Sequence, residues 1–376
     1  MSNKACRVCH QPLFEEVLLR YENMPKSAQF FPTVYELEYE KGNDLEVYQC
    51  SGCGLIQLNN EPVHYYREVI RAAGISAEMA TFRQKEFANW IQKYKLAGKR
   101  ILEVGCGQGE YLIILHQQNV EAYGVEYGQH AYEAGVAKGL TVERAFINSA
   151  VQKLEHAPFD GFMMLNFLEH LPEPNQTLQG IANNLTENAV GLVEVPNFDM
   201  ILRENMFSEF ISDHLFYFSK ETLISTLNRN GFEVLECNET WHDYSLSAVV
   251  RKRSITNLTS FQLCQQQLTE ALHSYIEQFE SVAIWGAGHQ ALAIMSLADL
   301  GGKICYIVDS ALFKQNKFTP ASHIPIFSPD KLNADPVEAV IVMAASYSIE
   351  VVDIIKKNFN HIKNVATLSG NGVQPV

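Results

Sequence analysis

Four cysteines near the N-terminus have the spacing of a metal site. They form two Cys-x-x-Cys pairs: Cys6, Cys9, Cys50 and Cys53. Four thiolates can bind zinc in tetrahedral geometry, and Gly52 and Gly54 suit a tight turn that directs backbone N–H groups at sulfur. A redox pair or chance clustering is the alternative, but a short segment with few large apolar side chains needs a cross-link to fold. We therefore expect a structural zinc ion with no open coordination position.

A glycine-rich loop follows the apolar stretch 101–104 and offers a second candidate site. Its glycines are Gly105, Gly107 and Gly109. Glycine lets the backbone turn sharply and brings its N–H groups close to a ligand. Glu103 precedes the loop, and a buried carboxylate there needs a partner such as the ammonium group of an amino acid. Glu126 ends the next predicted strand, where an acid accepts hydrogen bonds from ribose hydroxyls.

The loop lacks a phosphate-binding signature, since it has neither Gly-Lys-Ser/Thr nor a basic residue. The pattern fits S-adenosylmethionine, a nucleoside with an amino-acid tail, better than NAD or ATP. A phosphate or dinucleotide loop on the same fold is the alternative. Further candidate donor contacts follow the predicted strands: Tyr127, Asn148, Asn166 and Phe167. For Asn148, a surface turn residue is an equal alternative.

Two histidines follow later strands. His170 lies in a Glu-His-Leu-Pro sequence after the predicted strand 159–165, and His214 follows Asp213 in an aromatic run beyond the fifth strand. The carboxyl ends of strands line the ligand crevice of open α/β sheets. Aromatic walls shift the titration of an imidazole, and a carboxylate can orient it. We interpret His214 as a candidate base; the alternatives are a core histidine at 214 and an exposed helix-start turn at 170.

Strands and helices alternate around these residues. We predict strands at 100–104, 121–126, 141–146, 159–165 and 189–195, and helices at 64–97, 109–118, 129–138, 173–186 and 219–230. Such alternation indicates an α/β fold with a doubly wound parallel sheet. Two closely joined strands, 232–236 and 244–250, suggest a reversed hairpin at its edge.

A helix at 256–280 with a buried apolar seam separates this sheet from a second, smaller Rossmann-like α/β unit. The predicted domains are 1–62, 63–253 and 254–376. Gly286, Gly288 and Asp309 could bind a second nucleotide, but we favour a scaffold or lid that contributes to an acceptor pocket. Lys314 and Lys317 could meet a diphosphate, although solvated loop lysines are commoner.

Net charge, apolar runs and cysteine use exclude several classes of protein. The net charge is −14 without a basic run, which disfavours nucleic-acid binding. Neither a long apolar run nor a signal-peptide core is visible, so we expect a cytoplasmic protein that does not bind membranes and is a monomer or simple homo-oligomer. The remaining cysteines, Cys106, Cys237, Cys264 and Cys305, are expected to be reduced core thiols.

Taken in order, these parts resemble the sugar C-methyltransferase family, whose members use S-adenosylmethionine to methylate nucleotide-linked deoxysugars. The resemblance covers the four-cysteine segment, the class I methyltransferase sequence 103–109, and the C-terminal sequences 284–288 and 318–325. The run 213–219 resembles the family's acid–His motif, and His170 matches a histidine near the donor. The family's tyrosine three residues before the motif histidine is Ile211 here, and its tyrosine-rich stretch is only loosely present at 64–67.

The resemblance implies a mechanism. A base removes a proton next to the ketone of a 4-keto sugar, and the resulting enolate carbon attacks the donor's methyl group. His214 would be the base, oriented by Asp213, and His170 or Tyr66 would stabilise the oxyanion. The alternatives are O- or N-methylation of another small metabolite and a non-catalytic donor-binding scaffold.

Overall fold

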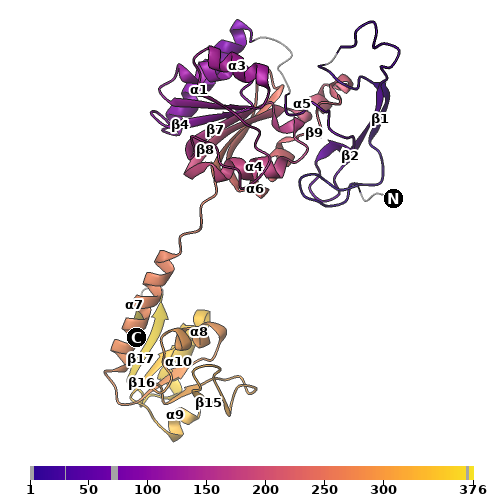
Figure 1. Cartoon of the computed structure of the whole chain (residues 1–376). Coiled ribbons are helices and arrows are strands. Elements are labelled where there is room, and N and C mark those ends of the chain that lie inside the picture. Colours follow the sequence, from indigo (N-terminus) through magenta and orange to yellow (C-terminus); the bar gives the residue numbers. More distant parts are fainter. Residues whose placement is uncertain (1–3, 30, 69–74, 370–371) are drawn as a thin grey trace. The chain divides into compact units, whose positions relative to one another are not determined.

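The computed structural model describes residues 4–29, 31–68, 75–369 and 372–376. They form two compact units, Met1–Ser254 and Ile255–Val376, each with its own core (Figure 1). Among these residues, none of the helices has the length and apolar character needed to cross a membrane.

The first unit is built on a seven-stranded sheet in the order β10-β11-β8-β7-β4-β5-β6. The strands are β4 (Arg100–Val104), β5 (Glu121–Glu126), β6 (Val142–Arg144), β7 (Phe159–Leu165), β8 (Leu185–Pro196), β10 (Phe232–Thr240) and β11 (Ser245–Lys252). β4 to β8 are parallel, and β11 runs antiparallel between β8 and the edge strand β10. The predicted doubly wound sheet and its reversed edge hairpin are confirmed.

Helices cover both faces of this sheet, with α1 and α3 on one side and α4 and α6 on the other (Figure 1). They are α1 (Ala77–Lys93), α2 (Glu110–His116), α3 (Gln129–Ala137), α4 (Pro174–Asn183), α5 (Phe198–Arg203) and α6 (Lys220–Arg229). Alternate strand residues enter opposite cores: Ile101 packs with α1, and Leu102 packs with α4 and α6. Burial on both faces explains the apolar runs of the central strands β4, β7 and β8.

The helix predicted at 64–97 is wrong in its first part. α1 begins at Ala77 because the Ser76 hydroxyl caps it, accepting from Met79 N at 3.1 Å. Residues 65–68 form a turn, and 69–74 lie outside the described residues. Phe87 and Trp90 are buried as the periodicity predicts.

The N-terminal segment contributes a second, four-stranded antiparallel sheet in the order β1-β2-β3-β9. Its strands are β1 (Leu19–Met24), β2 (Asn43–Gln49), β3 (Ile56–Leu58) and β9 (Phe216–Tyr217). β9 comes from the chain after β8, so the first unit joins the cysteine segment to the segment that carries His214. This pairing of β3 with β9 was not predicted from the sequence.

The second unit is a seven-stranded sheet in the order β14-β15-β13-β12-β16-β17-β18. Its elements are α7 (Thr259–Ile276), β12 (Val282–Trp285), α8 (His289–Leu297), β13 (Tyr306–Val308), β14 (Lys317–Phe318), β15 (Pro325–Phe327), α9 (Lys331–Ala334), β16 (Ala339–Val342), α10 (Ser348–Asn358), β17 (Asn364–Ser369) and β18 (Gly372–Pro375). The central strands are parallel, as predicted, and the two edge strands are antiparallel.

Two expectations about this unit and its cysteines are wrong. The apolar seam of α7 is buried only at its C-terminal end, at Leu272 and Tyr275, whereas Phe261 and Cys264 are exposed. Cys305 is exposed as well, so only Cys106 and Cys237 of the four scattered thiols are buried.

Candidate active site and cysteine cluster

The glycine-rich loop turns from β4 into α2 through three left-handed residues. The φ angles of Gly105, Gly107 and Gly109 are 71°, 55° and 84°. A Cβ on Gly109 would lie 2.2 Å from Leu140 Cδ1, and one on Gly105 would lie 3.0 Å from the ring of Phe167. Both the backbone conformation and the close packing therefore favour glycine.

Glu126 ties this loop to the end of β5. Its Oε2 accepts from Gly107 N at 2.9 Å, and its Oε1 accepts from Gly128 N at 2.7 Å. Burial raises the pKa of Glu126, while these two N–H groups lower it. Each carboxylate oxygen has two lone pairs, so Glu126 can hold the loop and still accept from a ribose hydroxyl.

Glu103, at the end of β4, is buried beside the same loop. Burial raises the pKa of the Cys106 thiol, and the charges of Glu103 and Glu126 raise it further. Two carboxyl groups therefore lie close to the backbone turn where the donor is expected.

Aromatic side chains flank the loop. Phe167, packed on Gly105, has its ring centroid 6.3 Å from that of Phe146, which in turn lies 6.1 Å from Tyr127 and 5.8 Å from Tyr66. Arg67 Nε donates to the Tyr66 hydroxyl at 2.9 Å. Tyr66 and Tyr127 thus belong to one aromatic group near the glycine turn.

Two predicted asparagines have different settings. Asn148 is an exposed loop residue after β6. Asn166, at the end of β7, has φ 51°; its N donates to Glu194 O at 2.8 Å, and its Nδ2 donates to Glu194 Oε1 at 3.3 Å. Glu194 is fully buried and pairs with Arg83 of α1 through both carboxylate oxygens. Sequence reasoning missed this ion pair, although an arginine on the apolar face of a predicted helix was a signal.

His170 and His214 lie side by side at the carboxyl edge of the sheet, with ring centroids 4.8 Å apart. His170 Nδ1 lies 2.8 Å from the main-chain oxygen of Asp213, and its Nε2 lies 3.8 Å from Glu169 Oε1. Burial lowers the pKa of both imidazoles, and for His214 the neighbouring His170 lowers it further. Both rings are therefore neutral at neutral pH and able to accept a proton.

The Asp213 carboxylate faces the N-terminal segment. It accepts from the Tyr65 hydroxyl at 2.6 and 2.9 Å and from Ala28 N at 3.2 Å. No hydrogen bond between this carboxylate and the His214 ring occurs in the described part of the chain. Tyr65, not the neighbouring Tyr66, is the tyrosine that reaches the acid–His pair.

The N-terminal segment holds the His214 segment on both sides. After His214, Phe216 and Tyr217 pair with β3, and Leu58 N donates to Leu215 O at 2.9 Å. Before it, the Ser212 hydroxyl donates to Pro25 O at 2.9 Å. The position of His214 therefore depends on residues far away in the sequence.

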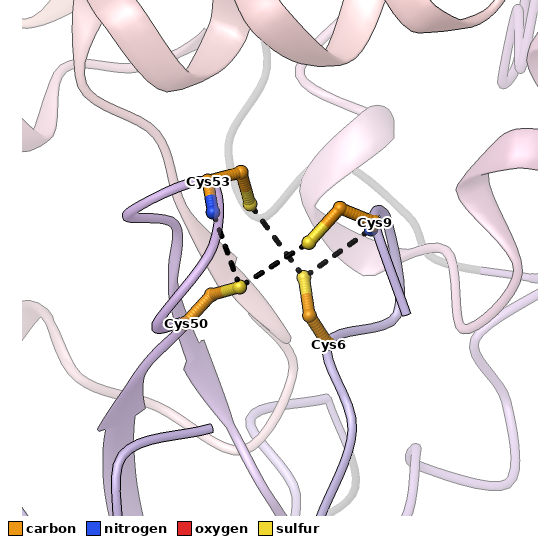
Figure 2. A group of neighbouring side chains, drawn as sticks. All are labelled: Cys6, Cys9, Cys50 and Cys53. Carbon is orange, nitrogen blue, oxygen red and sulfur yellow. Dashed lines mark hydrogen bonds between the residues drawn. The ribbon is translucent and has the colours of Figure 1, made fainter. Parts of the chain in front are cut away.

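The four cysteines converge as predicted (Figure 2). The Sγ atoms of Cys6 and Cys53 are 3.7 Å apart, and those of Cys9 and Cys50 are 3.3 Å apart. A tetrahedral zinc site with Zn–S bonds of about 2.3 Å places its sulfurs about 3.8 Å apart. The donor set and its spacing therefore fit a zinc ion.

Backbone N–H groups surround the sulfurs in the same way in both pairs. Cys6 Sγ accepts from the N atoms of residues 8 and 9, and Cys50 Sγ from those of residues 52 and 53. The residue after each pair, His10 or Gly54, is left-handed, with φ 62° and 77°. Such N–H groups stabilise thiolates, which are the form that binds zinc.

Two family models match the chain: a methyltransferase domain over residues 79–237 and a C-methyltransferase C-terminal domain over 257–363. The C-methyltransferase NovU of Streptomyces niveus is 23% identical over 93% of this chain and 91% of its own length. A ubiquinone biosynthesis O-methyltransferase of Azoarcus sp. (strain BH72) is 32% identical, over 25% of this chain and 43% of its own.

Among solved structures, the PH0226 protein from Pyrococcus horikoshii OT3 matches with a TM-score of 0.41 and 15% identity, over 50% of this chain and 98% of its own. Magnesium protoporphyrin IX methyltransferase from Synechocystis PCC 6803 with bound SAH matches with a TM-score of 0.39 and 15% identity. The match covers 50% of this chain and 93% of that one. From the sequence matches and the sheet order, the chain is an S-adenosylmethionine-dependent methyltransferase with a class I fold. The two C-methyltransferase matches support transfer to carbon.

Proposed function

We propose that this methyltransferase transfers its methyl group to a carbon atom of a nucleotide-linked keto-deoxysugar through an enolate. The observation that carries the proposal is the pair His170 and His214, two neutral imidazoles side by side at the carboxyl edge of the sheet. Transfer to carbon needs a base for a C–H proton, which a neutral imidazole provides. The sugar acceptor rests on the family resemblance of the 213–219 motif.

The donor lies along the carboxyl edge of β4 and β5 in this proposal. The glycine loop approaches its amino-acid tail and Glu103 balances the ammonium group, while Glu126 accepts from the ribose hydroxyls. The remaining contacts come from side chains around the loop: Tyr127, Asn148, Asn166 and Phe167. Loop N–H groups and buried carboxyl groups on this edge support the assignment.

The chemistry starts with proton removal. The acceptor ketone acidifies the neighbouring C–H bond, His214 takes the proton, and the electron pair of that bond becomes the enolate. The enolate carbon then attacks the methyl group on the sulfonium, and S-adenosylhomocysteine leaves. Neutral His170 donates its Nδ1–H to Asp213 O, so its Nε2 can donate to the oxyanion only in the protonated ring, whereas Tyr66, the second candidate for that role, would donate from its hydroxyl group. Acid–base assistance of this kind contributes roughly 10²–10⁴-fold in rate.

A structural zinc ion on Cys6, Cys9, Cys50 and Cys53 completes the proposal. The sulfur spacing supports it. The ion would cross-link the N-terminal segment that holds the His214 segment. We place the enzyme in the cytoplasm, where cysteines stay reduced and free to bind metal.

The test is deuterium exchange without donor. Nucleotide-linked 4-keto sugars are incubated with enzyme in D₂O, and the carbon next to the ketone is followed by NMR; methyl-labelled donor is then added to identify the methylated atom. His214→Asn should abolish exchange and turnover while donor affinity persists, and His170→Asn should slow both less. His116→Asn, an exposed histidine of α2, is the matched control. Wild-type exchange by His214→Asn would assign the base to another residue.

O-methylation is the second candidate, because the O-methyltransferase relatives match part of the chain. It requires no enolate. A methyl group on oxygen, formed without exchange at carbon, would establish it instead.

A further inference from the structure

The acid next to the base in sequence is not the acid next to it in space. The carboxylate of Asp213 is engaged by Tyr65 and Ala28 N. Glu169, on the short 3₁₀ turn after β7, is the carboxyl group at the histidine pair. One side-chain atom each from Glu169, His170 and His214 all lie within 4.8 Å of one another.

The setting of Glu169 is unusual for a structural residue. Its side chain is 1% exposed, and its Oε2 has no hydrogen-bond partner among the residues that the structure describes. Its Oε1 lies 3.8 Å from His170 Nε2, too far for a hydrogen bond. A buried carboxylate oxygen without a hydrogen-bond partner is costly to retain, which points to a role in the site.

The main chain of Glu169 is fixed to the same segment as His214. Its carbonyl oxygen accepts from Leu215 N at 2.8 Å. Since Leu215 directly follows His214, this bond keeps the main chain of Glu169 close to that of His214. The histidine pair and Glu169 therefore form one positioned group.

We propose that Glu169, rather than Asp213, is the carboxyl group that compensates the charge on His214 when His214 takes the acceptor's proton. This inference rests on the proposed function. The working form has Glu169 ionised and both imidazoles neutral; the acceptor C–H proton moves to His214, and its electron pair remains on the substrate as the enolate. The carboxylate of Glu169 then faces an imidazolium, so the cluster ends neutral. Glu169 is thus a positioning residue that acts through His214.

The charged groups around the cluster set its titration. Burial raises the pKa of Glu169 to about 8, and the carboxylate of Glu194 adds to this increase. Glu194 is itself paired with Arg83. The charge of Glu169 in turn contributes to the raised pKa of Tyr244, whose hydroxyl donates to Glu209 at 2.6 Å.

Burial lowers the pKa of His170. Asp213 raises it by a smaller amount, so the pKa of His170 stays below its ordinary value. The ring of Tyr217 lies 6.4 Å from that of His214. Because Glu169 is charged only above its own pKa, the active fraction of the cluster grows as the pH rises through about 8.

The first test is the pH profile of donor-independent deuterium exchange. The wild-type rate should rise through an apparent pKa near 8, and Glu169→Gln should lose this rise and be at least about tenfold slower at alkaline pH. Glu169→Asp should keep the rise, because it keeps an ionisable group. Asp213→Asn should lower the rate but leave the rise in place. Glu173→Gln, an exposed residue of the same segment, is the matched control.

The second test needs no acceptor. Imidazole ¹⁵N shifts of His170 and His214, assigned with the asparagine variants, should report a titration near pH 8 in the wild type that is absent in Glu169→Gln. A titration that persists in Glu169→Gln, or an unchanged exchange profile, would overturn the inference. A second metal ion per chain, lost in Glu169→Gln, would also overturn it, since the three groups would then be metal ligands.

The two tests also separate this inference from the proposed function. If the linked titration disappears in Glu169→Gln but no keto sugar exchanges its proton, the acceptor assignment fails and the charge coupling stands. Donor affinity measured by calorimetry shows that each variant is folded.

Discussion

Replacing Arg83 with Met should strongly destabilise the first unit. Arg83 lies on α1 and is fully buried. Its guanidinium donates to Glu194 through two nitrogens and to Glu86 at 2.6 Å. Burial alone would lower the pKa of Arg83, but the charge of Glu194 raises it, so the arginine stays charged.

The expected loss follows from what the substitution leaves behind. Arg83→Met keeps the apolar stem but leaves the carboxylate of Glu194 buried without its cation. Breaking a buried pair in this way costs about 3–5 kcal/mol. Lys93 of the same helix is the matched control, because its pair with Glu236 is 2.7 Å long but the lysine side chain is 60% exposed. Lys93→Met should cost only about 0–1 kcal/mol.

The assay is urea unfolding followed by tryptophan fluorescence. Trp90 lies on α1 and is buried; replacing the other two tryptophans, Trp241→Phe and Trp285→Phe, leaves it as the reporter. Arg83→Met should also weaken donor binding by about fivefold, because Glu194, which Asn166 contacts, loses the cation that positions it, at a cost of about 1 kcal/mol to the Asn166 contact. Calorimetry with S-adenosylmethionine measures this effect.

Equal losses for Arg83→Met and Lys93→Met would refute the reasoning, because burial would then make no difference to the cost of breaking an ion pair. The double variant Arg83→Met with Glu194→Met gives a second check. It removes both charges and should recover part of the lost stability. No recovery would assign the loss to packing.

Three further outcomes are expected. Cys50→Ser should abolish zinc binding, as measured by metal analysis, and reduce turnover while donor binding largely survives, because the four cysteines belong to the N-terminal segment and none of them to the glycine loop; zinc-free protein with full activity would contradict this. Glu126→Ala should weaken donor binding about tenfold or more in calorimetry, since the carboxylate holds the loop and is proposed to bind the ribose. Tight binding of NADH, without a response to the methyl donor, would contradict the assignment of the donor. The free energy of unfolding should fall between pH 4.5 and 8 through Glu169, whose pKa is raised from 4.5 to about 8, so that only the folded state keeps the proton over this range. Glu169→Gln should flatten that dependence in urea titrations; an unchanged slope would contradict it.

The fold of the central sheet could be predicted because its signals are local. A short window of sequence is enough to predict each element. Apolar runs such as 159–165 predict strands, glycine-rich stretches predict turns, and amphipathic patterns predict helices. The order of strands then follows from the few arrangements that alternating elements can adopt. The cysteine cluster was predictable for the same reason, since two short hooks need only to meet.

The structure brings His170 and His214 together, but their contacts with acids differ from those that the sequence predicted. The sequence placed Asp213 next to His214, and adjacency suggested that the acid orients the imidazole. In the structure the aspartate turns toward Tyr65, and Glu169 takes the place at the histidines. Asp213 lies in a turn that the His214 N–H closes on Ile211 O at 3.2 Å, and neighbouring side chains in a turn point in different directions.

The N-terminal segment explains how the short aromatic run around His214, the proposed base, is held in place. The residues around His214 form only a two-residue strand, β9, which has no stability alone. It is ordered by pairing with β3, by the bond between Leu58 and Leu215, and by the clamp of Tyr65 on Asp213. Cys50 directly follows β2 and Cys53 precedes β3, so this cysteine pair lies in the turn that joins the two strands. A metal ion that fixes this turn would therefore affect the proposed base His214 indirectly, because it would hold β3, the strand with which β9 pairs.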